Sequence, residues 1–129
     1  MAKLTVHRFH PEIYPRYLFV VKGGTVQQIK QAFKDEDGDE LLAVDDAYKC
    51  SKAAVWRVSY GEEKHLGVLV WITGKMGVKD IAHEACHVAA QVFLDCNVHW
   101  DGLNDEHFAY MTGWAADCIN QVWTGKFKD

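Results

Sequence analysis

Two adjacent stretches decide the fold: AVWRVSYGEEKHLGVLVWIT at residues 54–73 and VKDIAHEACHVAAQVFLD at residues 78–95. The first contains two runs of β-branched and aromatic residues, 54–60 and 66–73, separated by the polar letters GEEKH. Such runs joined by a short polar loop predict a β-hairpin. The second stretch is rich in alanine, has no proline and repeats apolar residues every three or four positions, so it predicts one helix over 78–95.

The remaining elements flank this centre on both sides. We expect strands at 4–9 and 14–21, a short helix at 25–33, a solvated acidic loop at 35–40, a segment at 41–52 that is either helical or irregular, and a final helix at 104–123. Strands come first and the two long helices come last, which is typical of the α+β class. A chain of 129 residues is expected to form a single domain, 1–129, with a small, twisted, mostly antiparallel sheet packed on the two long helices.

Charge and hydropathy narrow the classes of partner. The formal net charge is −4 and the chain has no cluster of lysine and arginine, so we expect no nucleic-acid partner. The longest apolar run, Val68 to Ile72, is far shorter than the roughly 20 residues that span a bilayer. The first residues lack a continuous apolar signal segment. We therefore expect a cytoplasmic protein without a membrane partner, and the sequence predicts no particular oligomeric state.

The four cysteines do not suggest a metal site of their own. They stand at Cys50, Cys86, Cys96 and Cys118, and no two of them form a C-x-x-C pair. In a reducing compartment we expect free thiols rather than a closed cysteine-rich zinc site. Cys86 lies inside the histidine motif described next, where we expect it to pack between helices.

The helix at 78–95 carries the motif His83-Glu84-Ala85-Cys86-His87, which matches H-E-x-x-H. Residues four apart on an α-helix lie on the same face, so the two imidazoles can converge on one metal ion. Glu84 stands to the side of that face, near enough to reach a metal-bound water and take its proton. The motif therefore predicts a Zn²⁺ site with His83 and His87 as ligands and Glu84 as general base.

A catalytic zinc usually has a third protein ligand. A histidine ten residues after His83 would serve in one known arrangement, but that position is Phe93. Glu106, nineteen residues after His87 in the first turn of the predicted final helix, is our preferred third ligand. The alternatives at this stage are His99, Asp101, Asp105 and His107.

Together, His83-Glu84-Ala85-Cys86-His87 and the later Asn104-Asp105-Glu106-His107-Phe108-Ala109-Tyr110 resemble the zincin metallopeptidases of the gluzincin type. The short chain is also similar to small metallopeptidases encoded by phages and prophages. The resemblance covers residues 53–123 and implies a zincin-like fold. It also implies zinc held by the two histidines and Glu106, and cleavage of a peptide or protein substrate. Such domains lay the substrate as an extended strand along a sheet edge, which implicates the hairpin at 54–73.

The resemblance is incomplete around the third ligand. Many gluzincins have an aspartate four residues after that ligand, where this chain has Tyr110. Tyr110 and His107 are candidates for the residue that stabilises the transition state, and we prefer Tyr110 as a catalytic residue. Asp80 and Asp117 are candidates for orienting the imidazoles. The alternative function is a metal-binding but non-hydrolytic interaction protein, for example one with which a phage modulates its host.

Overall fold

The computed structural model describes residues 3–47 and 52–128. The elements in chain order are β1 (His7–Phe9), β2 (Tyr17–Lys22), α1 (Val26–Ala32), β3 (Phe33–Lys34), α2 (Val44–Ala47), β4 (Ala53–Tyr60), β5 (His65–Ile72), α3 (Val78–Asp95) and α4 (Glu106–Thr124). The predicted α+β class is confirmed, and the helix expected over 78–95 has the bounds of α3.

One five-stranded mixed sheet forms the centre of the molecule, in the order β1-β2-β5-β4-β3. The hairpin expected from the sequence is β4 with β5, paired antiparallel from Ala53↔Ile72 to Tyr60↔His65. β2 runs parallel to β5, whereas β1 and β3 pair antiparallel with their neighbours. The sheet is therefore mostly antiparallel, as predicted, but its central pair β2–β5 is parallel.

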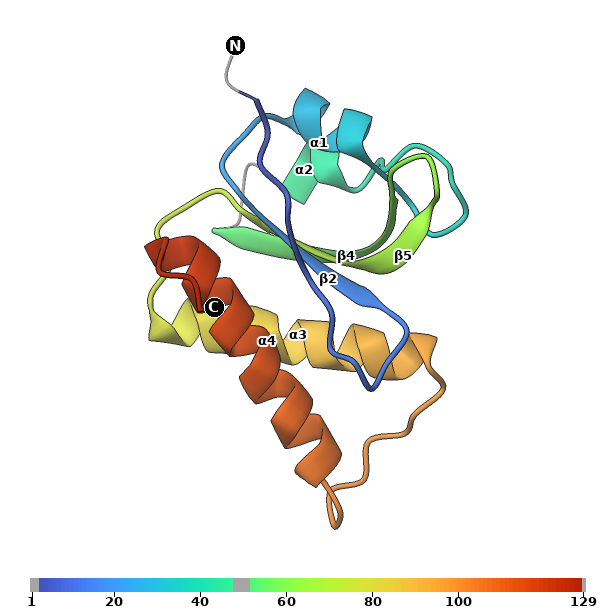
Figure 1. Ribbon diagram of the computed structural model, residues 1–129, viewed down its shortest axis with the longest axis vertical. Coiled ribbons are helices and arrows are strands. Elements are labelled where there is room, and N and C mark those ends of the chain that lie inside the picture. The colour runs from blue at the N-terminus through green and yellow to red at the C-terminus, as the bar shows by residue number, and fades with distance from the viewer. Residues whose placement is uncertain (1–2, 48–51, 129) are drawn as a thin grey trace.

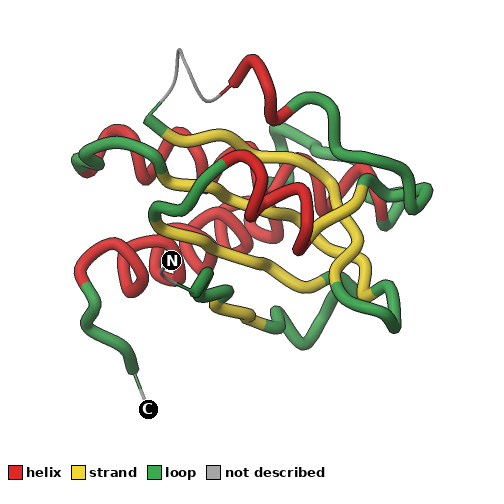
Figure 2. The backbone as a smooth tube through the Cα atoms, turned by 90° about the horizontal axis from the view of Figure 1, so that it is seen from above, coloured by secondary structure: helices red, strands yellow, loops and turns green. Residues whose placement is uncertain are grey.

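Helices cover both faces of this sheet, and each face has its own hydrophobic core. α3 and α4 lie on one face and the short α1 and α2 on the other, as Figure 1 shows. Figure 2 looks from the side of α1, with the strands between the short and the long helices. Along β5, Val68, Val70 and Ile72 pack with the long helices, whereas Leu69 and Trp71 pack with the short ones. Burial on both faces explains why this strand is a continuous apolar run.

The ends of α3 are defined by local signals and fastened to β4. Its first turn is capped by Asp80, whose Oδ2 accepts a hydrogen bond from the Gly77 N–H at 2.8 Å. The same carboxylate lies 3.5 Å from the Lys52 Nζ, next to the start of β4. At the other end of α3, Asp95 pairs with Arg57 of β4 at 3.0 Å. These two ion pairs hold α3 alongside the outer edge of β4.

Several boundaries differ from the sequence prediction. Phe33 was expected to end the first helix, but the helix ends at Ala32 and Phe33, in extended backbone, forms β3 with Lys34. Within the ambiguous segment 41–52, α2 occupies Val44–Ala47, and 48–51 lie outside the described residues. α4 begins at Glu106 rather than Asn104. In the part of the chain that the structure describes, no helix has the length and apolarity needed to cross a membrane.

Candidate metal centre

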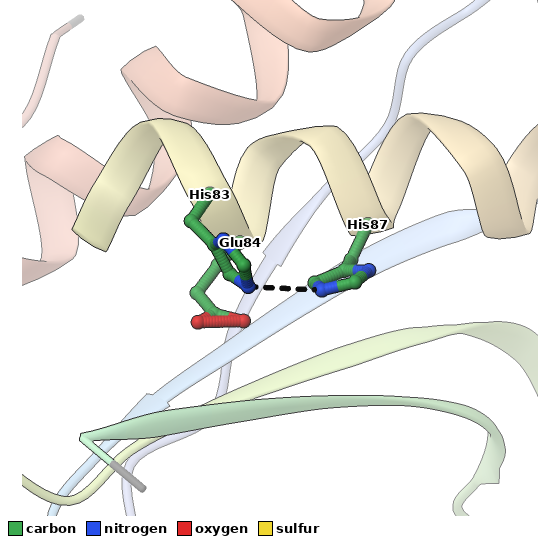
Figure 3. A group of neighbouring side chains, drawn as sticks. All are labelled: His83, Glu84 and His87. Atoms are coloured by element: carbon green, nitrogen blue, oxygen red, sulfur yellow. Dashed lines mark hydrogen bonds between the residues drawn. The ribbon is translucent and has the colours of Figure 1, made fainter. Parts of the chain in front are cut away.

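The two histidines of the motif converge on the side of α3 that faces the sheet (Figure 3). The Nε2 atoms of His83 and His87 lie 3.1 Å apart. Their ring centroids are 4.7 Å apart and the ring planes are inclined by 78°. Both side chains are exposed. The i, i+4 spacing thus brings two imidazole nitrogens within hydrogen-bond distance of each other at the surface.

Glu84 lies beside this pair and completes the cluster. Ligand atoms of His83, Glu84 and His87 all lie within 4.8 Å of one another, and this is the only such group of metal-ligating side chains among the described residues. Glu84 is mostly buried, with 9% of its surface exposed. Burial raises the pKa of its carboxyl group, an effect that the two histidines partly offset. A carboxylate with a raised pKa is a better proton acceptor than an exposed one.

A pocket of about 470 Å³ opens in front of this cluster. One wall is α3, with Asp80, Glu84 and Gln91 beside the two histidines, and the opposite wall is Lys52 together with the start of β4, residues 53–55. The pKa of Asp80 is lowered, chiefly because its carboxylate accepts the Gly77 N–H, with a smaller effect of Lys52. A negative and a positive side chain therefore border the pocket at the end where α3 begins.

The structure does not bring the predicted third ligand to the histidines. Glu106 is the first residue of α4 and is exposed. It does not belong to the described cluster of metal-ligating side chains and does not line the pocket. Tyr110, one turn later, is 75% exposed and lines a separate apolar pocket with Ile13 and Trp114. The sequence correctly predicted that Glu106 lies in the first turn of the last helix. The packing of α4 on α3 decides where that turn lies relative to the two histidines.

The other candidates named from the sequence lie apart from the two imidazoles or are already paired. Asp117 pairs with Lys128 at 3.0 Å and accepts from Gln121 at 3.2 Å. Asp80 lines the pocket but is engaged by Gly77 and Lys52. His99, Asp101, Asp105 and His107 are exposed and outside the cluster.

Among the cysteines, Cys86, Cys96 and Cys118 are free thiols as expected, whereas Cys50 lies outside the described residues. Cys86 is exposed rather than packed between helices. It follows the motif Glu by two residues, a step of about 200° around the helix, which turns it away from the buried side where Glu84 lies.

Two parts of the site were not foreseen from the sequence. Gln91 stands one turn after His87 on the same face, and its buried Oε1 accepts no hydrogen bond in the described part of the chain. Lys52, the residue before β4, lines the pocket and was not singled out. The i+4 spacing from His87 could have identified Gln91, whereas the placement of Lys52 depends on how β4 packs beside α3.

Comparison with known proteins does not assign this site. No known family model matches it, and no match was found among curated proteins or solved structures. What the site does must therefore be inferred from its own geometry and chemistry.

Proposed function

We propose that this protein is a zinc-dependent hydrolase that cleaves a peptide bond. The observation that carries the proposal is the convergence of His83 and His87 at 3.1 Å beside the mostly buried Glu84, in a pocket bordered by β4. The proposal includes a zincin-like arrangement, in which the helix with the H-E-x-x-H motif runs beneath a sheet and along its edge.

The donor geometry supports zinc. Two nitrogens bound to one tetrahedral zinc at about 2.0–2.1 Å lie about 3.3 Å apart, close to the 3.1 Å between the two Nε2 atoms. Imidazole nitrogen is a common ligand of zinc, whereas calcium and magnesium prefer oxygen ligands. Since Glu106 is outside the cluster, His83 and His87 are the ligands on which the proposal rests.

Glu84 is the proposed general base. A zinc ion held by the two imidazoles would supply Lewis acidity, which lowers the pKa of a bound water and polarises the scissile carbonyl. The Glu84 carboxylate would take the proton of the attacking water and pass it to the leaving amine. Its burial suits this role because desolvation raises the proton affinity of the carboxylate. Tyr110 is not used in this scheme, since it lines a different pocket.

An extended peptide is the proposed substrate because the edge of β4 is open next to the site. β5 occupies one edge of β4 along its whole length, whereas β3 pairs with the other edge only at Ser59 and Tyr60. Among the described residues, the outer edge from Ala53 to Arg57 has no strand partner, and its first part lines the pocket. A peptide added to that edge would gain backbone hydrogen bonds and lie across the two histidines.

The test replaces Glu84 by Gln and measures zinc content and cleavage separately. Zinc-loaded wild-type protein is incubated with a library of peptides from a digested proteome, and new termini are identified by mass spectrometry. We expect cleavage by the wild type, a loss of at least about 100-fold in E84Q, and unchanged zinc stoichiometry. E62Q, in the exposed β4–β5 turn, is the matched control and should cleave normally.

Two outcomes would contradict the proposal in different ways. A wild type that binds zinc stoichiometrically but cleaves no peptide would indicate the alternative, a non-hydrolytic metal-binding interaction protein. A wild type that binds no zinc at neutral pH would show that the motif is an accident of a helical sequence.

A further inference from the structure

The groove at the candidate metal centre continues along α3 and β4 into a second pocket. This second pocket has a volume of about 330 Å³ and shares Val55 and Gln91 with the first. Beyond these two residues it is bounded by Trp56 and Arg57 of β4, Leu94 of α3 and the acidic loop at 35–37. A chain lying along the edge of β4 would therefore pass from one pocket to the other.

The second pocket combines apolar walls with an acidic rim. Leu41, Trp56 and Leu94 provide the apolar surface. Glu36 is paired with Arg57 at 3.3 Å, whereas Asp37 has no ion-pair partner among residues 3–47 and 52–128. Apolar walls suit the alkyl stem of lysine or arginine, and a free carboxylate together with a tryptophan suits the cationic end.

The loop that presents Asp37 is held in place by its own hydrogen bonds. The Asp35 Oδ1 accepts from the N–H groups of Asp37 and Asp39, both at 2.9 Å, and the Asp35 carbonyl oxygen accepts from the Ser59 hydroxyl at 2.9 Å. Ser59 belongs to β4, so the loop is fastened to the strand that borders the groove. The Asp37 carboxylate is thus set at the rim, while Asp35 serves to shape the loop.

Gln91 gives a separate indication that the groove receives a ligand. Its Oε1 is buried where the two pockets meet and accepts no hydrogen bond in the described chain. A buried acceptor without a donor is costly, and an N–H group of a bound chain would satisfy it.

We propose that this second pocket binds a lysine or arginine side chain of the substrate, on the N-terminal side of the cleaved bond, with Asp37 as the specificity-determining carboxylate. This inference rests on the proposed peptidase function and deepens it. The side of the bond follows from strand direction, taking the peptide to pair antiparallel to β4, the more stable pairing. β4 and α3 both run from the metal centre toward the second pocket. A peptide antiparallel to β4 therefore places its earlier residues in that pocket.

The length of the groove predicts how far the basic residue lies from the cleaved bond. Gln91 and Leu94 are on average seven to eight residues further along α3 than the midpoint of the two histidines, which is about 11 Å of helix. An extended peptide covers this distance in about three residues. The basic side chain is thus expected about three positions before the cleaved bond.

The experiment compares cleavage-site preferences of zinc-loaded wild type, D37N, D37K and the control E62Q on the same proteome-derived peptide library. In the wild type and E62Q we expect lysine and arginine to be enriched about fivefold, two to four residues before the cleaved bond. D37N should lose this enrichment, and D37K should replace it by enrichment of aspartate and glutamate. Unchanged melting temperatures of the variants would show that the fold is intact. Cleavage without basic enrichment, or enrichment that persists in D37N, would overturn the inference.

A binding measurement decides the inference even if no peptide is cleaved. Zinc-loaded E84Q is titrated with otherwise identical capped decapeptides of alanine and serine that carry either one lysine or one norleucine. We expect the lysine peptide to bind about fivefold more tightly, and the advantage to vanish in E84Q/D37N. Equal affinities would refute the pocket assignment. Absence of cleavage by the wild type together with a lysine advantage would refute the proposed hydrolysis alone.

Discussion

Zinc binding by the two imidazoles can be measured as thermal stabilisation, and its loss can be assigned to individual residues. We predict that Zn²⁺ raises the melting temperature of the chelator-treated wild type and that H83A and H87A each lose most of this increase. The reason is geometric: the two Nε2 atoms are 3.1 Å apart, a separation that suits two ligands of one ion, and removing either leaves a single imidazole.

The size of the effect follows from linkage. A ligand at one hundred times its dissociation constant stabilises the folded state by about 2.7 kcal/mol. Unfolding entropy is about 2.1 cal/mol/K per residue, or about 0.27 kcal/mol/K for this 129-residue chain. The expected increase in melting temperature is therefore about 10 °C. If the loss of one imidazole weakens binding by about 100-fold, the same zinc concentration gives about 0.4 kcal/mol, an increase of about 1.5 °C.

The assay is differential scanning calorimetry or circular dichroism at pH 7.5 with a zinc titration. H99A and H107A are matched controls, because both histidines are exposed and lie outside the cluster. E106Q tests the ligand predicted from the sequence, and the structure predicts that it keeps the full increase. Equal increases in H83A, H87A and the wild type would refute the reasoning. A loss in E106Q as large as in H87A would show that α4 closes on the site when zinc binds.

Three further predictions test the sheet, the buried carboxylate and the thiols. A methyl group added at Gly67 would overlap a backbone carbonyl oxygen of β2. G67A should therefore lower the free energy of unfolding, measured in urea, by at least about 2 kcal/mol. The control G113A, which has open space around it on α4, should raise the free energy of unfolding by about 0.5–1 kcal/mol. Because burial raises the pKa of Glu84 in the folded state, its contribution to stability falls as pH rises from the unfolded to the folded pKa. Metal-free E84Q should therefore melt above the wild type at neutral pH. The difference should shrink as the pH is lowered toward about 4.5, the ordinary pKa of a glutamate, and should stay constant below that pH; a difference independent of pH would contradict this. Iodoacetamide at pH 8 should modify the exposed Cys86 well before Cys118, because burial raises the pKa of the Cys118 thiol to about 12. Peptide mapping that finds the reverse order would contradict the structure.

Much of the fold could be predicted because it depends on local patterns. The two runs of β-branched and aromatic residues that form β4 and β5 identified the hairpin, and the polar residues between them identified its turn. The 3.6-residue period and the absence of proline identified α3. β3 could not be predicted, because only two residues pair and their partners are at the far end of β4. The parallel pairing of β2 with β5 joins strands far apart in the sequence and leaves no local signal.

By itself the sequence determined the core of the site: an i, i+4 spacing on one helix brings His83 and His87 together wherever that helix lies, with Glu84 beside them. Only the tertiary structure decided what faces them. The packing of helices on the sheet decides which residues of β4 and of the acidic loop border the groove. It also decides that Glu106 and Tyr110 do not border it. Helical geometry relates residues four apart, whereas contacts between separate elements arise from the burial of their apolar faces together.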